Sequence, residues 1–209
     1  KSCPDSFGHP CHADLYGHVS YYWISDYKNG LVKYDTYGNS RIISTEGPPK
    51  NDFFTIAGQD GKIVVTGGTI DRIELSYSLS GAYAMKDETW TLFDKASQAP
   101  KWDNNTWAIG SAAINPKDIE EIALGGYCAN GLSIAHGDQI TDVYNASNSI
   151  LENTTVGNNQ MCITSLEYDE DGNLWIANAY SMKPLKVKMA DGSWYAMSTP
   201  GTAASVFIT

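Results

Sequence analysis

The stretch DEDGNLWIANAY, from Asp169 to Tyr180, contains the pattern that decides the fold of this chain. An acidic turn with a glycine leads into a short apolar run with a tryptophan, and a polar loop follows. The pair Asp171-Gly172 suits a tight hairpin, because these residues tolerate the positive φ that such turns need. The run Leu174–Ile176 combines aromatic and aliphatic residues and is typical of a β-strand. We interpret the stretch as part of a repeated β unit whose role is structural.

Three other segments show the same order of run, turn and loop. They begin at Ser20, Asp60 and Glu120. The spacing of about 40 to 60 residues is that of propeller blades. Each unit has runs such as YYWIS, LVKYD and SRIIS, rich in β-branched and aromatic residues or alternating between apolar and polar. We predict an all-β fold of β-propeller blades, each a four-stranded antiparallel meander, at about 13-45, 53-98, 107-147 and 160-198, with the start of a further blade at 203-209.

A single four-stranded sheet cannot bury both of its faces, whereas sheets stacked around an axis cover one another. Trp23, Trp175 and the run Leu174–Ile176 are then expected to pack between blades. Propellers commonly have about 4 to 8 blades. We predict that residues 1-209 form one partial propeller within a larger ring, and a small ring closed by the four blades and the further strand is the alternative. Because the chain starts at Lys1, we expect a processed product or a segment of a longer protein. The stretch PKDIEEIAL, from Pro116, is predicted as a turn that continues into a strand.

Composition excludes several classes of function. The chain has 209 residues, of which 42% are hydrophobic and 18% charged, which suffices for a real core. Its net charge of −10 and the lack of a basic run disfavour nucleic acid as a partner. No run of about 18 apolar residues occurs, so no membrane-spanning segment is predicted.

The four cysteines fall into two groups. Cys3 and Cys11 lie in the entry segment KSCPDSFGHPCH and form a candidate disulfide, as in small loops of exported proteins. The alternative is a metal site that adds His9 and His12, although the spacing fits none of the usual zinc patterns. Cys128 and Cys162 lie in apolar runs and are expected to be buried thiols.

No catalytic constellation of good specificity is present, so the chain is predicted not to be an enzyme. The G-x-S-x-G elbow of α/β-hydrolases is absent. A glycosidase needs only two carboxylates, and the candidates are Asp26, Glu167, Asp169 and Asp171. The last two sit at a predicted hairpin, where aspartate is a turn former. The turn does not fit the EF-hand template, so no cofactor and no metal site are predicted, and a calcium ion at this turn is kept as the alternative.

A ligand or partner is expected at the loops on one face of the blades. In a meander blade, the loop between the second and third strands lies on the same face as the link to the next blade. Tyrosines, amides and a few charges on this face suit a sugar or a protein partner, and ordinary solvated loops are the alternative. The candidate ligand-binding residues are Asp26, Tyr27, Lys28, Tyr127, Asn130, Tyr180 and Lys183.

These motifs carry a resemblance to known families. DEDGNLWIAN followed by strands that begin PL or GL resembles the two-component-regulator propeller repeat of periplasmic sensors in Bacteroidetes. Most of residues 20–198 is similar to the PorZ-like proteins of the type IX secretion system, on the segments YYWISDYKNGLVKYD, EGPPKNDFFTIAGQDGKIVVTGG and GGYCANGLSIAHGDQITDVYNASNSIL. The resemblance implies an exported propeller in the machinery that processes and anchors secreted cargo, with a sugar-bearing lipid as ligand.

We therefore predict a non-enzymatic scaffold or binding module for type IX secretion and cargo attachment. Its expected location is extracytoplasmic, at the outer membrane and cell surface or in the periplasm. Its expected partners are other secretion-system proteins or a glycan such as lipopolysaccharide. The alternatives are a ligand-sensing periplasmic propeller of a hybrid two-component regulator and a carbohydrate-active enzyme.

Overall fold

The regular structure of the chain consists of β-strands. The computed structural model describes residues 10–15, 21–26, 30–43, 47–48, 53–70, 75–76, 81–104, 106–127, 131–154 and 160–198, and within these ranges it contains no helix. The chain divides into two compact units, Lys1–Gly47 and Pro48–Thr209. No helix suitable for crossing a membrane occurs in the part of the chain described.

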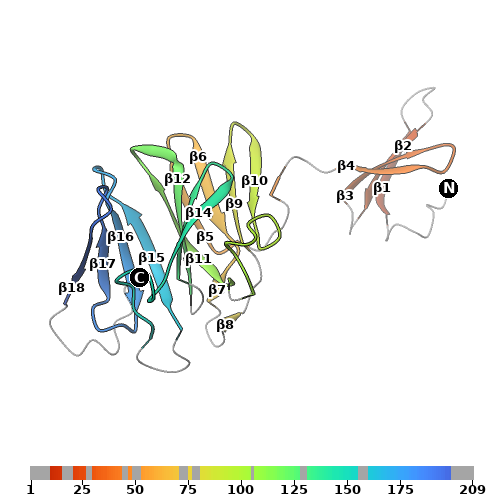
Figure 1. Cartoon of the computed structure of the whole chain (residues 1–209). Helices are drawn as coiled ribbons and strands as arrows, with labels where there is room; N and C mark the ends of the chain where they lie inside the picture. Colours follow the sequence, from red (N-terminus) through yellow and green to blue (C-terminus); the bar gives the residue numbers. More distant parts are fainter. Residues whose placement is uncertain are drawn as a thin grey trace. The chain divides into compact units, whose positions relative to one another are not determined.

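The first unit holds one four-stranded antiparallel sheet, called blade 1 (Figure 1). Ile24 and Val32 lie opposite each other on neighbouring strands and are both buried. Lys33 lies over the ring of Trp23, with the ammonium 5.7 Å from the ring centre. The strands, in the order in which they pair, are β1 (Pro10–Leu15), β2 (Tyr21–Asp26), β3 (Gly30–Asp35) and β4 (Ser40–Ile43).

The second unit holds three four-stranded antiparallel sheets, called blades 2, 3 and 4, which confirm the predicted meanders (Figure 1). Blade 2 also carries a small hairpin that was not predicted, formed by β7 (Thr69–Ile70) and β8 (Leu75–Ser76). Blade 2 consists of β5 (Thr55–Gln59), β6 (Lys62–Thr66), β9 (Ala82–Lys86) and β10 (Thr89–Phe93). Blade 3 consists of β11 (Ile109–Asn115), β12 (Asp118–Gly126), β13 (Leu132–His136) and β14 (Gln139–Tyr144). Blade 4 consists of β15 (Cys162–Tyr168), β16 (Leu174–Ala179), β17 (Leu185–Lys188) and β18 (Trp194–Met197).

The faces of blade 3 are both buried, as expected for the middle sheet of a stack. Successive side chains of a strand point to opposite faces, so Ile122 and Leu124 join the core shared with blade 2, while Ala123 joins the core shared with blade 4. The predicted packing role of Leu174 and Ile176 is confirmed, because both lie in this second core. The stretch from Pro116 is a turn followed by β12, as predicted.

Trp175 differs from the prediction of packing between blades. Its neighbours in sequence face blade 3, so its own side chain lies on the opposite face of blade 4, where it is half-buried. Its indole Nε1 donates a hydrogen bond to Asp169 Oδ2 at 2.9 Å. The tryptophan of the opening motif therefore braces the hairpin of its own blade.

One kind of hairpin loop recurs in the chain. At 35–39, 169–173 and 189–193 the first residue donates its N–H to the carbonyl of the fifth, and the fourth residue is a glycine with positive φ. This is the three-residue loop with a glycine bulge that joins twisted antiparallel strands. In the first two loops an aspartate, Asp35 or Asp169, accepts hydrogen bonds from the backbone of the loop. The predicted turn role of Asp169 is therefore confirmed.

Two adjacent glutamates of β12 tie blade 3 to both of its neighbours. Glu120 accepts hydrogen bonds from Lys62 Nζ at 3.1 Å and Lys86 Nζ at 2.6 Å, both in blade 2. Glu121 Oε1 accepts one from the hydroxyl of Tyr168 in blade 4 at 2.7 Å. The alternation of side chains along a strand sends these two carboxylates to opposite faces.

Candidate functional site

The loop ends of blades 3 and 4 bring together two of the predicted ligand-binding residues. Tyr127 follows β12 and Tyr180 follows β16, and both pack around Cys162 at the start of β15. Burial raises the pKa of Tyr127 to about 12, and the hydrogen bond and charge of Tyr180 add to this effect. The two tyrosines thus form a small polar contact over an apolar floor.

Of the other predicted ligand-binding residues, the structure describes Asp26 and Lys183. Asp26 ends β2 in the first unit, and its side chain is buried rather than open to a ligand. Lys183 lies exposed in the loop between β16 and β17. Tyr27, Lys28 and Asn130 lie outside the described residues. Their part in binding stays a prediction.

The prediction for Cys162 was wrong in one respect. Its side chain is buried as expected, but it is disulfide-bonded rather than a free thiol. Apolar neighbours in the sequence indicate that a cysteine is buried. They do not reveal which loop lies next to the end of its strand, and so they do not indicate a disulfide partner. Cys128 lies outside the described residues, and so do the side chains of Cys3 and Cys11, whose disulfide stays a prediction.

An ion pair between a buried lysine and a half-buried glutamate fixes the loop that carries Tyr180 and Lys183. The ammonium of Lys186 is fully buried and lies 3.0 Å from Glu152 Oε1, in the link between blades 3 and 4. The same ammonium donates to Asn178 Oδ1 at 3.0 Å and to the carbonyl of Lys183 at 2.6 Å. Burial lowers the pKa of Lys186, and Glu152 counteracts this. Because four oxygen atoms surround the cation, counting Ser181 Oγ at 3.2 Å, the loop is held firmly.

The carboxylate and the backbone groups of Glu152 also have hydrogen-bond partners. Its Oε2 accepts a hydrogen bond from the N–H of Met182 at 3.0 Å, while its backbone N–H and carbonyl both bond to the side chain of Asn178. The link between blades and the loop between the second and third strands therefore lie on the same face. This contact leaves a surface hollow of about 510 Å³ between the link, the loop and β18. We call it the loop-face hollow; it is lined by Ile150, Glu152, Met182, Lys183, Trp194, Tyr195 and Ala196.

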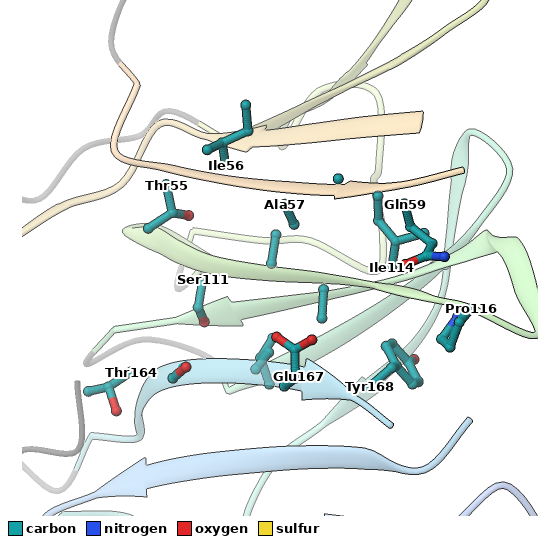
Figure 2. A pocket seen from close by; sticks show the side chains of 15 residues that line it. Thr55, Ile56, Ala57, Gln59, Ser111, Ile114, Pro116, Thr164, Glu167 and Tyr168 are labelled. Carbon is teal, nitrogen blue, oxygen red and sulfur yellow. The ribbon is translucent and has the colours of Figure 1, made fainter. Parts of the chain in front are cut away.

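A second hollow, of about 400 Å³, runs along the first strands of the three blades, β5, β11 and β15. Figure 2 shows Thr55, Ser111 and Thr164 at one end of this wall and Gln59 and Tyr168 toward the other. Two of the hydroxyls already have partners, since Thr55 Oγ1 lies 2.8 Å from Thr66 Oγ1 and Thr164 donates to the carbonyl of Ala177. Ser111 Oγ is buried and makes no hydrogen bond within the described residues, and Gln59 and Glu167 also line the hollow, so it offers a few polar groups to a ligand.

The geometry argues against acid-base catalysis by two of the candidate carboxylates, Asp169 and Glu167. Hydrogen bonds from Trp175 and Asn173 lower the pKa of Asp169 to about 2. That carboxyl is therefore ionised at neutral pH and cannot serve as a general acid. Glu167 is the only charged residue among those that line the second hollow, so a second carboxylate is lacking in that lining. Within the described ranges, no group of three or more metal-ligating side chains is placed to hold an ion.

Sequence reasoning missed the residues that shape the loop-face hollow. Lys186 alternates with Leu185 and Val187, a pattern that places it on the polar face of a half-exposed strand. In a stack of sheets that face is also covered, and the lysine is buried against the link that carries Glu152. The only sequence signal is the pairing of a lone glutamate in the link with a lysine in the third strand.

Comparison with known proteins places the fold. The sequence matches no protein-family model and no curated protein. In structure the chain is similar to PorZ, an essential surface component of the type IX secretion system of Porphyromonas gingivalis, at 17% identity and a TM-score of 0.67. The likeness covers 92% of this chain and 26% of PorZ, so the chain spans about a quarter of the length of that protein. The predicted PorZ-like propeller is confirmed at the level of the fold.

Two extracellular domains from B. thetaiotaomicron are less similar. One, from a hybrid two-component system, shares 14% identity at a TM-score of 0.47, covering 90% of this chain and 23% of that one. The other, from a one-component system, shares 20% identity at a TM-score of 0.45, covering 88% of this chain and 22% of that one.

Proposed function

We propose that this chain is a non-enzymatic, extracytoplasmic propeller segment that serves as a scaffold and binding module in type IX secretion and cargo attachment. The observation that carries the proposal is the likeness to PorZ over 92% of the chain at a TM-score of 0.67, together with the resemblance of its sequence motifs. At 17% identity this likeness supports a shared fold, and the role is our inference from it.

Two features of the structure support a binding role outside the cytoplasm. The disulfide at Cys162 fits an oxidising compartment, because disulfides rarely persist in the cytosol. The loop that carries Tyr180 and Lys183 is held by the Lys186–Glu152 ion pair. A surface loop that is already ordered loses little conformational entropy when a partner binds, which favours affinity. Of the carboxylates considered for glycoside hydrolysis, Asp169 is bound within a turn, and Glu167 lines a hollow whose lining holds no second carboxylate.

The test is deletion of the gene that encodes this chain in its native bacterium, followed by measurement of cargo on the cell surface. We expect cargo proteins to be lost from the surface fraction and to accumulate without attachment. Complementation with a double variant that changes two loop residues, Tyr180→Asn and Lys183→Ala, is expected to restore attachment only partly. Asparagine is chosen because Tyr180 has a φ of 56°, which asparagine tolerates.

The matched control is Lys117→Ala, an exposed lysine at the turn that starts β12, at the opposite end of this strand from Tyr127. This variant is expected to restore attachment fully. Unchanged cargo attachment in the deletion strain would refute the secretion role. If that strain instead lost a transcriptional response to a polysaccharide, the chain would belong to a sensor of the two-component type.

A further inference from the structure

Among the described strands, the outer strand of each blade pairs with a neighbour on one side only. In blade 3 a segment of the same chain covers the open edge. The N–H of Ile140 in β14 donates to Gln98 Oε1 at 2.8 Å, and Gln98 Nε2 donates to the carbonyl of Asp138 at 3.0 Å. Lys101 Nζ donates to the carbonyl of Thr141 at 2.7 Å. The segment that follows blade 2 thus satisfies the backbone groups along this edge. Such covering prevents unwanted strand pairing.

The open edge of β18 in blade 4 differs. Met189 donates its N–H to the carbonyl of Ser193 at 2.8 Å, which makes these two residues a hydrogen-bonded pair. Hydrogen-bonded and non-bonded pairs alternate in an antiparallel ladder. Tyr195 and Met197 therefore bond to β17, whereas the N–H and carbonyl groups of Trp194 and Ala196 point to the open edge. Within the described ranges, no side chain or strand closes this edge as Gln98 closes that of β14.

The residues of β18 carry none of the usual protection of an edge strand. The strand reads WYAM, with no charge and no proline. Tyr195 is 57% exposed and Met197 39% exposed. An uncharged, apolar and open edge favours pairing with another strand.

The loop-face hollow lies directly along this edge. Trp194, Tyr195 and Ala196 line it on one side, and Met182, which is 67% exposed, lines it on another. The position of Met182 is fixed, because its N–H donates to Glu152 Oε2. The hollow therefore offers a fixed apolar surface beside four backbone groups that point away from β17 and have no partner among the described residues. Methionine and aromatic residues are enriched at protein interfaces.

The lining of the hollow holds one carboxylate and one ammonium, and the buried ammonium of Lys186 makes the local net charge positive, although the whole chain carries −10. Its one carboxylate, Glu152, is paired with Lys186 and with the N–H of Met182. Its other charged residue, Lys183, makes no ion pair within the described part of the chain. An acidic group is thus the electrostatic complement of this hollow.

We propose that β18 accepts an extended segment of a partner protein as a fifth strand of blade 4. The segment pairs its backbone with Trp194 and Ala196, places an apolar side chain in the loop-face hollow, and places an acidic side chain near Lys183. This is recognition by strand addition, in which backbone bonds give affinity and side-chain pockets give specificity. The proposal does not depend on the role in secretion, because it concerns the outer edge of one sheet in any propeller of this sequence.

The test uses a fluorescein-labelled peptide, Thr-Val-Phe-Asp-Val with blocked ends, and fluorescence anisotropy with the whole chain. We expect saturable binding of this peptide below about 1 mM, the range of weak recognition. Methylation of the backbone nitrogens on one edge of the peptide should abolish binding, while methylation on the other edge should not. This asymmetry is specific to strand pairing, because simple hydrophobic contact is insensitive to the edge that is methylated.

Two variants locate the site. Ala196→Pro removes an N–H that points to the open edge, a position at which proline is compatible with a strand. It should weaken binding at least tenfold, which is about the value of one to two hydrogen bonds, while the melting temperature of the chain stays the same. Lys183→Gln should weaken binding about two- to fivefold, as for an exposed ion pair. That loss should disappear when the aspartate of the peptide is replaced by asparagine, and Lys117→Gln is the matched control.

Several results would overturn the proposal. These are no binding of the unmethylated peptide at about 1 mM, equal binding of both methylated peptides, or full binding by a folded Ala196→Pro variant. Should this variant fail to fold, the pair of methylated peptides decides the question with the unaltered chain. Dimerisation through β18 without peptide, seen by analytical ultracentrifugation and lost in Ala196→Pro, would show that the occupant is a second copy and would also overturn it.

Discussion

The ion cluster between blades 2 and 3 allows a prediction with a defined pH window. Hydrogen bonds from Lys86 and Lys62 lower the pKa of Glu120 from 4.5 to about 2. A shift of this size is worth about 3 kcal/mol if unscreened. The side chain of Glu120 is 36% exposed and that of Lys86 43% exposed, so screening by solvent reduces the contribution to about 1 kcal/mol.

The variant Glu120→Gln should cost more than this at neutral pH. The side chain of Lys62 is only 4% exposed, so the substitution leaves a buried ammonium without its counter-ion. An unpaired buried polar group costs about 1 to 3 kcal/mol. We expect a total loss of about 2 to 4 kcal/mol in the free energy of unfolding, measured by urea denaturation at pH 7.

The pH dependence follows from the direction of the shift. A carboxyl whose pKa is lower in the folded state stabilises the protein above the pKa of the unfolded state. The contribution of Glu120 is therefore complete above pH 4.5 and is lost as the pH falls toward 2. The difference in stability between wild type and Glu120→Gln should shrink over this window. The control is Glu170→Gln, an exposed glutamate without an ion pair in the described part of the chain. A difference that stays constant from pH 7 to pH 3 would refute the reasoning.

Three further perturbations test other contacts, each by urea denaturation. Tyr168→Phe removes the hydroxyl that donates to Glu121 between blades 3 and 4, and should cost about 1 to 2 kcal/mol; no loss would show that this bond contributes nothing. Gly131→Ala should cost more than about 1 kcal/mol, because φ is 99° and the new Cβ would lie 2.4 Å from the carbonyl oxygen of Tyr144; a neutral effect would show that the backbone can shift. Reduction of the disulfide at Cys162 should cost about 2 to 5 kcal/mol; equal stability with and without reductant would contradict a structural role.

The strands and their turns could be predicted because they depend on local chemistry. The alternation and β-branched content of runs such as KIVVT follow from the pleat of a strand. Asp60 and Gly61 both adopt positive φ at the hairpin between β5 and β6, as their residue types indicate. The similarity of the blades to one another could also be predicted from these sequence runs, because each blade repeats the same order of strands and turns.

The candidate site could be predicted only in part, because it depends on contacts between distant segments. The face that carries Tyr127, Tyr180 and Lys183 follows from the meander, but the ion pair of Glu152 and Lys186 joins residues of two blades. A binary pattern of polar and apolar residues cannot tell a lysine that faces water from one that faces a counter-ion in the next sheet. The disulfide at Cys162 was missed for the same reason.

The stacking of sheets explains why polar groups occur inside this fold. Every strand of a middle blade is covered on both faces, so polar side chains near the strand ends must find partners in the neighbouring blades. Glu120 and Glu121 do so in opposite directions, toward Lys62 and Tyr168. In blade 4 the residue aligned with Glu121 is Asn173, and Trp175, which aligns with Ala123, bonds to a turn of its own blade. The chemistry of the face of blade 4 opposite blade 3 is set by the half-buried Trp175 and the exposed Tyr195.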